Sequence, residues 1–460
     1  MTEVSASPRA SDFLSARGEL ETVARLALPI ALAQFGLMLL GLVDVAILGH
    51  ASSTELGGAS IGRSIGFASL SLGIGASSAL EPLAAQAVGA GEDEQAWHAL
   101  VATLKACTLV WAPCALLAIA ATFALEPIGI DRALVGPARA FLVAQMPGLL
   151  GFTLFLTAKT YLQAHRVTVP ALVATVVANV VNVIVCNALV HAELRAFGHS
   201  MSLGFRPLGA LGAGMASSVA SIVMAVWMVI AAYRRRPPLS PTRPKDAAST
   251  KKVLRLGMPI GMQLLTEIGV FSLVAVLAGR LGAVAVASHQ IAIGLASFTF
   301  MGVLGISGAT AVRVGHAIGE RRSPRQPGLL GIGLGAAFML VSGAVFLTIP
   351  ELLIRLFTDD PNVVALGVTL LRIAAGFQLF DGVQGVAAGA LRGAGDVRMA
   401  FVVNLAAHWL VGFPLAMLLG FHLHWGAPGF WWGLLVGLFL VAVFLTWRFV
   451  VITRGPVGRV

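Results

Sequence analysis

The chain has 460 residues, of which 57% are hydrophobic and only 11% are charged, and its formal net charge is +10. Its mean hydropathy is +0.88. A soluble protein of this length needs far more charge to cover its surface, so the composition excludes an ordinary soluble globular protein.

Apolar stretches long enough to cross a bilayer recur along the whole chain. The polar residues 1–22 lack the short apolar core of a cleavable signal peptide. We therefore predict an all-α polytopic membrane protein with twelve transmembrane helices. The segments are expected at residues 23–49, 59–88, 98–123, 139–162, 168–191, 209–233, 254–279, 285–318, 329–349, 364–391, 399–421 and 429–452.

The basic residues indicate the orientation of these segments. Most of the 31 Lys and Arg fall in the N-terminal arm, in every second connection and at the C-terminus. Because cytoplasmic loops carry an excess of Lys and Arg, both termini are predicted to be cytoplasmic. The positive charge is thus a topology signal. We expect membrane lipid, and no nucleic acid, as the partner of these charges.

The two halves of the chain resemble each other. The stretch RLALPIALAQ (25–34) resembles RLGMPIGMQL (255–264), and AAQAVGAGE (84–92) resembles VRVGHAIGE (312–320). Each half has an even number of segments, so the repeats run parallel, around an axis along the membrane normal. This predicts two six-helix bundles related by pseudo-two-fold symmetry, with a substrate cleft between them. A purely structural duplication is the alternative.

The repeat also divides the chain into predicted domains. The N-terminal lobe (helices 1–6) is expected at residues 1–232 and the C-terminal lobe (helices 7–12) at residues 253–460. A basic, proline-rich stretch at 233–252 is expected to link them on the cytoplasmic side.

Three carboxylates lie deep inside predicted segments: Asp44 in the first, Glu267 in the seventh and Asp381 in the tenth. A charged side chain at the bilayer centre costs about 2.5–3.5 kcal/mol on insertion scales. No buried Lys or Arg is evident from the sequence as a partner for them. Because burial favours the neutral form of a carboxyl group, each can take up a proton, or bind a hard cation through its oxygens. We interpret all three as cation-coupling residues.

Polar side chains accompany these carboxylates at helical spacing. Polar side chains are unfavourable at positions exposed to lipid, so these side chains must face the interior of the bundles. Hydrogen bonding between helices is the alternative role, and the favoured one for a lone Asn or Gln. The supporting polar residues are Asn179, Asn182, Gln263, Gln378 and Gln384.

Several motifs together resemble the multidrug and toxic compound extrusion (MATE) family, NorM-type branch. They occur in order over nearly the whole chain: ALPIALAQFGLMLLGLVDVAILGH (27–50), SALEPLAAQAVGAGE (78–92), GMPIGMQLLTEIGVF (257–271), ASHQIAIG (287–294), AVRVGHAIGE (311–320) and FDGVQGVAAGALRGAGD (380–396). The resemblance implies an antiporter that exports cationic amphipathic organic compounds in exchange for H+ or Na+ by a rocker-switch mechanism. It implies no enzyme activity and no cofactor other than the coupling ion.

The resemblance also implies where ions bind. It assigns one site to Asp44 with polar groups of the fifth segment, and a second site, with a possible Na+, to Glu267 and Asp381. The family pattern has an Asn or Asp where this chain has Cys186, four residues after Asn182. We therefore expect Asp44 to act mainly through protons, and any Na+ dependence to reside with Glu267 and Asp381.

Further residues are candidates for the substrate cleft. Aromatic faces near the acidic positions can hold organic cations, and inward polar groups can line the cleft. For the aromatic residues, lipid-facing packing is the alternative; for His289 and Gln290, it is a hydrogen bond between helices. The candidates are Gln34, Phe271, His289, Gln290, Phe377 and Phe380. We expect a monomer in a bacterial-type inner membrane.

Two other functions compete with multidrug export. A flippase for lipid-linked oligosaccharides on a related fold needs Arg or Lys deep in its helices to hold a pyrophosphate. Here Arg63 and Arg313 lie nearer segment ends, and the deep charges are acidic. An intramembrane enzyme with two carboxylates is the other alternative, but no nucleophile–base or metal-ligand pattern accompanies the acids.

Overall fold

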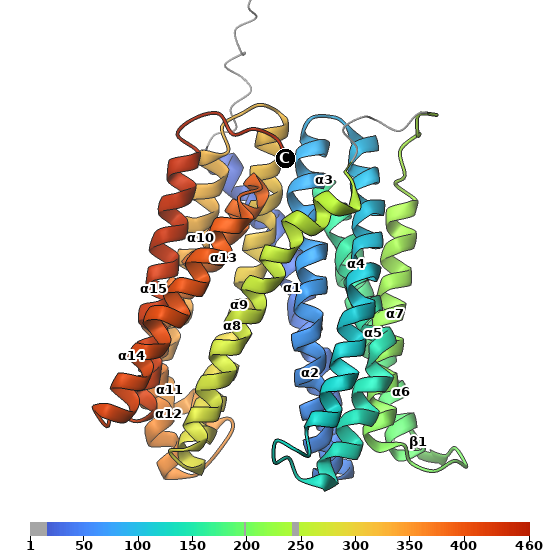
Figure 1. The fold of residues 1–460 in the computed structure, drawn as a ribbon, viewed down its shortest axis with the longest axis vertical. Helices are drawn as coiled ribbons and strands as arrows, with labels where there is room; N and C mark the ends of the chain where they lie inside the picture. The colour runs from blue at the N-terminus through green and yellow to red at the C-terminus, as the bar shows by residue number, and fades with distance from the viewer. Residues whose placement is uncertain (1–15, 197–198, 242–247) are drawn as a thin grey trace, which may run out of the picture.

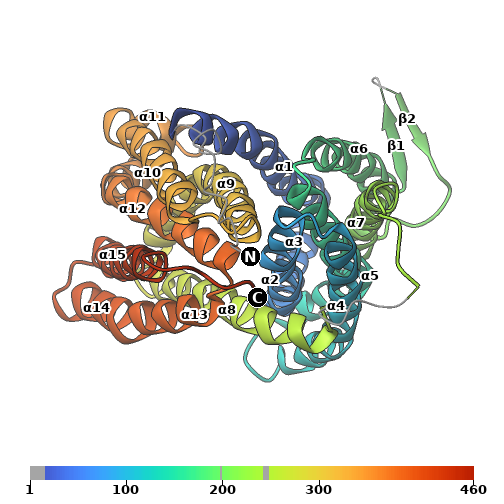
Figure 2. The same cartoon turned by 90° about the horizontal axis from the view of Figure 1, so that it is seen from above.

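The computed structural model describes residues 16–196, 199–241 and 248–460. Residues 1–15 of the predicted N-terminal lobe and 242–247 of the predicted linker lie outside the described residues. Within the described part almost the whole chain is helical. A short antiparallel hairpin of β1 (Glu193–Ala196) and β2 (His199–Ser202) projects beside the sixth and seventh helices (Figure 2).

The helices follow the predicted segments in both halves. The first half contains α1 (Ala16–Ala51), α2 (Ser53–Ser78), α3 (Leu80–Gly89), α4 (Asp93–Ala121) with a final 3-10 turn (Thr122–Ala124), α5 (Arg132–Ala164), α6 (Val169–His191) and α7 (Gly209–Tyr233). The second half contains α8 (Thr250–Gly279), α9 (Ala283–Gly319), α10 (Arg325–Thr348), α11 (Pro350–Arg355), α12 (Pro361–Ala394), α13 (Val397–Leu405), α14 (Phe413–Met417) and α15 (Ala427–Ile452).

Among the described residues, 11 helical spans are long and apolar enough to cross a membrane. One of them, Val397–His422, consists of α13 and α14 joined by the π-helical turn Ala406–Gly412, and it ends in a second π-helical turn, Leu418–His422. The remaining predicted segment, 59–88, is formed by α2 and α3, which meet at Ala79. The prediction of twelve membrane-crossing segments is confirmed.

The helices of the two halves pack in the same pattern. In the first half α1 packs on α6, α2 on α5, and α5 on α7. In the second half the helices at the same places in the repeat do likewise: α8 packs on α13, α9 on α12, and α12 on α15. Figures 1 and 2 show the two resulting bundles side by side. The predicted pair of six-helix bundles with pseudo-two-fold symmetry is therefore confirmed.

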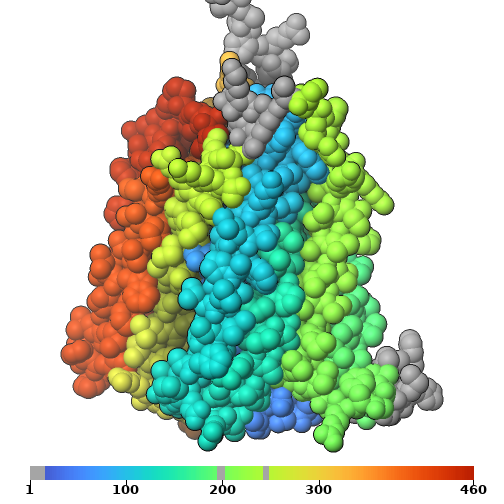
Figure 3. All heavy atoms as spheres, turned by 45° about the vertical axis from the view of Figure 1, so that its right-hand side comes forward, coloured from blue at the N-terminus to red at the C-terminus, as the bar shows by residue number. Residues whose placement is uncertain are grey.

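The bundles meet where α2 crosses α8 and where α1 crosses α9, two contacts that the repeat makes equivalent. At the first crossing Gly75 lies against Gly257 and Gly261. At the second, Gly305 lies against Ala27 and Ala31. Figure 3 shows α8, in yellow-green, along the line where the bundles meet. Small residues allow both pairs of backbones to approach closely.

Ion pairs join the two bundles at the end of the molecule where the C-terminus lies (Figure 1). Arg313 of α9 holds Glu19 of α1 through two hydrogen bonds of 2.7 Å each, and both side chains are buried. Arg392 of α12 bonds Glu81 of α3 at 2.9 Å. The first pair is bidentate and buried, and the second is half-buried. Because a bidentate pair is geometrically specific, these contacts hold the bundles together at this end.

The residues after α15 add to this closed end. The amide of Gln86 on α3 donates to the carbonyl of Gly393 on α12 (3.0 Å) and accepts from the backbone nitrogen of Val460 (2.9 Å). Arg459 bonds Glu92, and this hydrogen bond lowers the pKa of the Glu92 carboxyl. Figure 2 shows the C-terminus above the junction of the bundles.

Candidate functional site

The carboxylate of Asp44 lies inside the first bundle, where its side chain is only 2% exposed. Its Oδ1 accepts a hydrogen bond from Nδ2 of Asn182 on α6 (2.8 Å). Its Oδ2 accepts from Oγ of Ser217 on α7 (2.5 Å) and from Nη2 of Arg63 on α2 (3.2 Å). Three helices therefore supply donors to one acidic side chain of α1.

The contact with Arg63 corrects two expectations. The prediction that no buried Lys or Arg pairs with the acidic residues is wrong for Asp44. The expectation that the deep charges are only acidic is also wrong here, because the packing of α2 on α1 brings the guanidinium of Arg63 to the Asp44 carboxylate. Sequence reasoning missed this pair because the two residues lie on different helices, whose relative rotation the pattern does not specify.

The other residues of the predicted N-terminal site divide between two places. Cys186 interacts with the Asp44 carboxylate, at the position where the family pattern has an Asn or Asp. Asn179 lies elsewhere: its Nδ2 donates to the carbonyls of Gly36 and Thr175, each at 2.8 Å. Ser217 was not predicted, and a serine in a small-residue helix gives no distinctive signal.

In the second bundle, one amide bridges the two predicted carboxylates. Nε2 of Gln384 lies 3.1 Å from Oδ1 of Asp381 on the same helix, α12, and 3.5 Å from Oε1 of Glu267 on α8. Nδ2 of Asn404 on α13 lies 3.4 Å from Oε2 of Glu267. Among the described residues, no Lys or Arg forms an ion pair with either carboxylate. This is the carboxylate pair of the C-terminal lobe.

Asn404 is a member of this cluster that sequence reasoning missed. Its backbone carbonyl lies 3.2 Å from Nδ1 of His408, at the start of the π-helical turn Ala406–Gly412. The side-chain atoms Asn404 Oδ1 and His408 Nε2 are buried without a hydrogen-bond partner among the described residues. Single π turns inside helices are frequent at functional sites. The four-residue spacing of these polar residues in an apolar segment was the available signal.

The remaining predicted polar residues lie around the cluster. Gln263 is buried on α8, one turn before Glu267. Gln378 is buried on α12, but its amide donates to Thr299 (2.5 Å) and Ser342 (2.7 Å). It therefore faces α9 and α10 instead of joining the carboxylate pair.

The aromatic candidates lie mainly inside the second bundle. Phe377 is buried, with the rings of Phe271 and Trp431 at 6.1 and 5.6 Å between centroids. Phe380 packs edge-on against Phe439 at 5.1 Å. These contacts indicate that Phe377 and Phe380 pack within the bundle. Phe271, beside Phe377, is only half-buried.

The polar cleft candidates differ in exposure. His289 is buried and accepts a hydrogen bond from Nε1 of Trp431 on α15 (3.2 Å), which is the inter-helix role that the sequence left open. Gln290, the next residue, is exposed. Gln34 on α1 is half-buried.

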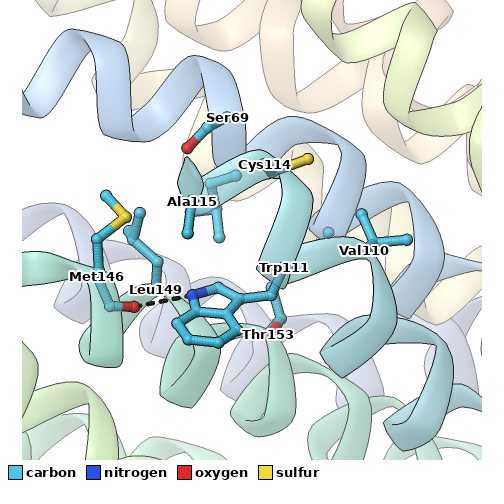
Figure 4. Close-up of a pocket in the computed structure, with 10 residues that line it drawn as sticks. Ser69, Val110, Trp111, Cys114, Ala115, Met146, Leu149 and Thr153 are labelled. Atoms are coloured by element: carbon cyan, nitrogen blue, oxygen red, sulfur yellow. Dashed lines mark hydrogen bonds between the residues drawn. The ribbon is translucent and has the colours of Figure 1, made fainter. Parts of the chain in front are cut away.

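A separate small pocket lies between α2, α4 and α5 (Figure 4). The indole nitrogen of Trp111 points across it and donates to the carbonyl of Met146 (3.0 Å). Its lining is uncharged, with Ser69, Cys114 and Thr153 among the residues. It therefore offers no charge to balance an organic cation, unlike the carboxylates above.

Comparison with known proteins decides the family. A sequence model described as MatE matches twice, at residues 29–187 and 259–418, once in each half of the repeat. The chain belongs to the MatE family. MatE proteins are transporters, so this is a membrane transporter of the inner membrane and the alternative of an intramembrane enzyme is wrong.

Individual relatives agree with this MatE assignment. The chain is 35% identical to a probable multidrug resistance protein NorM of Pseudomonas putida, over 94% of each chain. It is 34% identical to a probable multidrug resistance protein NorM of Deinococcus radiodurans, over 96% of this chain and 97% of the relative. The NorM-type resemblance read from the motifs is therefore confirmed.

Solved structures share the fold. The eukaryotic MATE transporter AtDTX14 superposes with a TM-score of 0.83 at 22% identity, covering 95% of this chain and 96% of that one. The Vibrio cholerae MATE transporter VcmN in the bent form gives a TM-score of 0.83 at 17% identity, covering 95% and 98%.

Proposed function

We propose that this MatE protein exports cationic, amphipathic organic compounds in exchange for H+ or Na+. The names of its NorM relatives support multidrug export. The observation that carries the ion exchange is the pair of the half-buried Glu267 and the buried Asp381, bridged by Gln384 and bonded by no Lys or Arg among the described residues. A positive charge that enters this site meets net negative charge.

The chemistry of the pair explains how exchange works. Two carboxylates close together in a low-dielectric interior repel each other, so binding of one cation to the pair is favourable. A proton satisfies this need alone, whereas Na+ requires several oxygen ligands. The amides of Asn404 and Gln384, whose nitrogens contact the pair, would have to supply some of these oxygens. We favour H+ because it needs fewer ligands. An organic cation in the cleft then competes electrostatically with the bound ion.

The movement that couples ion binding to export of the organic cation is a rocking of one lobe against the other. The closed end of the molecule carries the basic linker, so we assign that end to the cytoplasm and this structure to an outward-facing state. The crossings at Gly75 and Gly305 are the places about which the lobes pivot. Binding of the coupling ion and of the drug favours opposite states, which is what exchange requires.

Two further properties are part of the proposal. The protein works as a monomer surrounded by lipid, since one chain contains both lobes and both carboxylate sites; light scattering of the purified protein measures its mass.

Both termini are cytoplasmic. A Ser240→Cys variant tests the orientation: an impermeant thiol reagent should label it only in inverted vesicles, and labelling in intact cells contradicts the assignment.

The decisive experiment is efflux from proteoliposomes with pH and Na+ gradients imposed separately. Efflux of a fluorescent organic cation driven by a pH gradient, with Na+ absent, supports H+ exchange. Efflux driven only by a Na+ gradient, with pH clamped and a protonophore present, supports Na+ exchange. If neither the pH gradient nor the Na+ gradient drives efflux of the organic cation, the proposed function is contradicted.

A further inference from the structure

The residues that follow α15 run from one lobe to the other. Residues 454–460, the C-terminal strap, continue from α15, a helix packed in the C-terminal lobe, and Pro456 cannot extend that helix. The side chains of Val457 and Val460 are half-buried, whereas the other residues of the strap are exposed. Val457 packs on the apolar cluster formed mainly by helices of the second bundle, and Val460 packs on the cluster formed mainly by helices of the first.

Two polar contacts attach the C-terminal strap to the N-terminal lobe. The backbone nitrogen of Val460 donates to Oε1 of Gln86 on α3 (2.9 Å), and the side chain of Gln86 is buried. Arg459 forms an ion pair with Glu92, in the turn between α3 and α4. Because this ion pair is partly exposed, it contributes little to the attachment. The hydrogen bond to the buried amide and the packing of Val460 therefore provide most of it.

The same point of attachment also touches the C-terminal lobe. Nε2 of Gln86 donates to the carbonyl of Gly393 at the end of α12 (3.0 Å). A methyl group on Gly395, which directly follows α12, would collide with the side chain of Val460. Val460 therefore lies where α3 meets the end of α12. Separation of the lobes at this end must remove Val460 from one of these two surfaces.

The C-terminal strap is built to release without disturbing either lobe. A methyl group added to Gly455 or to Gly458 would meet nothing within 4 Å, so both glycines are free of packing contacts. Glycine also leaves the backbone on either side of Val457 conformationally permissive. Segments with few buried contacts open locally at low cost in free energy. Release of the strap therefore requires no unfolding of the bundles.

We propose that the C-terminal strap stabilises the state in which the cytoplasmic end is closed, and that it detaches from Gln86 when the lobes separate there. The strap thereby sets how readily the protein reaches the inward-facing state. This rests on the rocking movement of the proposed function and adds a segment that controls the balance between its two states.

A cysteine in place of His316 reports separation of the lobes at this end. His316 on α9 is buried, and its Nε2 lies 2.7 Å from the carbonyl of Ala164 on α5, across the junction of the bundles. A polar thiol reagent therefore reaches position 316 only after the lobes separate. The readout is the labelling rate of purified His316→Cys protein in lipid nanodiscs. Protein with His316 intact gives the background from the three native cysteines.

Deletion of residues 457–460 in this reporter protein should raise the labelling rate about tenfold, within the range typical of coupled equilibria. Gly458→Ala is the matched control and should leave the rate unchanged, because the added methyl group meets nothing within 4 Å. In Gln86→Ala protein the deletion should have a smaller effect, because the strap has already lost its acceptor. If the deletion variant does not fold, Val460→Asp, which places a charge in the same contact, takes its place.

The outcomes separate the role of the strap from the movement itself. If position 316 is labelled above background but the deletion leaves the rate unchanged, or raises it equally with and without Gln86, the proposal about the strap is overturned and the rocking movement stands. If position 316 is labelled above background in no variant, the rocking movement and the role of the strap both fail. Ion exchange is tested separately, by efflux from proteoliposomes, and that result does not depend on the strap.

Discussion

Gly75 on α2 and Gly261 on α8 lie so close that a Cβ atom on Gly75 would be 2.2 Å from the backbone nitrogen of Gly261. At the equivalent crossing, a Cβ on Gly305 would be 2.7 Å from the backbone nitrogen of Ala31. In both cases the obstacle is backbone, which cannot move aside as a flexible side chain does. The two lobes therefore depend on these glycines for their contact.

We predict that Gly75→Ala and Gly305→Ala each force the lobes apart, lower stability by about 1–3 kcal/mol and slow efflux. Gly294, on the same helix as Gly305, is a suitable control because a methyl group added there would meet nothing within 4 Å. Gly294→Ala should be neutral, or stabilising by about 0.5–1 kcal/mol. Thermal unfolding in detergent and efflux assays provide the measurements; equal behaviour of all three variants would refute the prediction.

The carboxylate pair yields a second prediction. Glu267→Gln and Asp381→Asn should each reduce ion-driven efflux at least about tenfold, as when a ligand-supporting group is lost, while protein still reaches the membrane. Glu351→Gln is the control, because that acid is exposed and, within the described part of the chain, its ion pair is with Arg355 one turn later. Drug-resistance assays and immunoblots of membranes give the comparison. Full resistance in both core variants would assign the pair a structural role.

Asn404 should tune the same site. The Nδ2 atom of Asn404 bonds Glu267, and its Oδ1 has no hydrogen-bond partner among the described residues. Asn404→Ala is therefore expected to weaken the apparent affinity for the coupling ion by about 10–100-fold. Asn187→Ala provides the control, since the described residues give that side chain a bond within its own helix, to the carbonyl of Val183. Efflux measured against increasing ion gradient tests this; an unchanged half-maximal gradient would exclude a role for Asn404.

The buried ion pair of Glu19 and Arg313 should stabilise the closed end. Either Glu19→Gln or Arg313→Gln leaves one buried charge unpaired and should cost about 3–5 kcal/mol. The double variant should recover much of this loss, because no unpaired charge remains. Removal of the exposed pair Glu351–Arg355 should change stability by no more than about 1 kcal/mol.

Labelling by an impermeant thiol reagent of a cysteine introduced near the closed end reports whether the closed state is lost. The single variants should increase labelling from the side of the linker, since they favour separation of α1 from α9. Unchanged labelling together with wild-type stability would show that the ion pair is not a latch.

The sequence by itself determined the helices, the repeat and the identity of the three deep carboxylates. Hydropathy and segment length are local properties, and lipid imposes helical structure on any apolar span, so these features follow without knowledge of tertiary contacts. The duplication likewise appears directly as similar stretches, and their alignment gives Gly257 and Gly261 the positions in the second repeat that Ala27 and Ala31 have in the first.

Only the tertiary structure decided which polar groups meet. Gln378 and Asp381 are three residues apart on α12, yet the first bonds α9 and α10 and the second lies with Glu267 on α8. Periodicity cannot separate these roles, because α12 is surrounded by other helices and has no single inward face. Arg63 meets Asp44 and Asn404 meets Glu267 for the same reason: the rotation of each helix about its axis is set by packing against its neighbours, and that rotation is not encoded in any one segment.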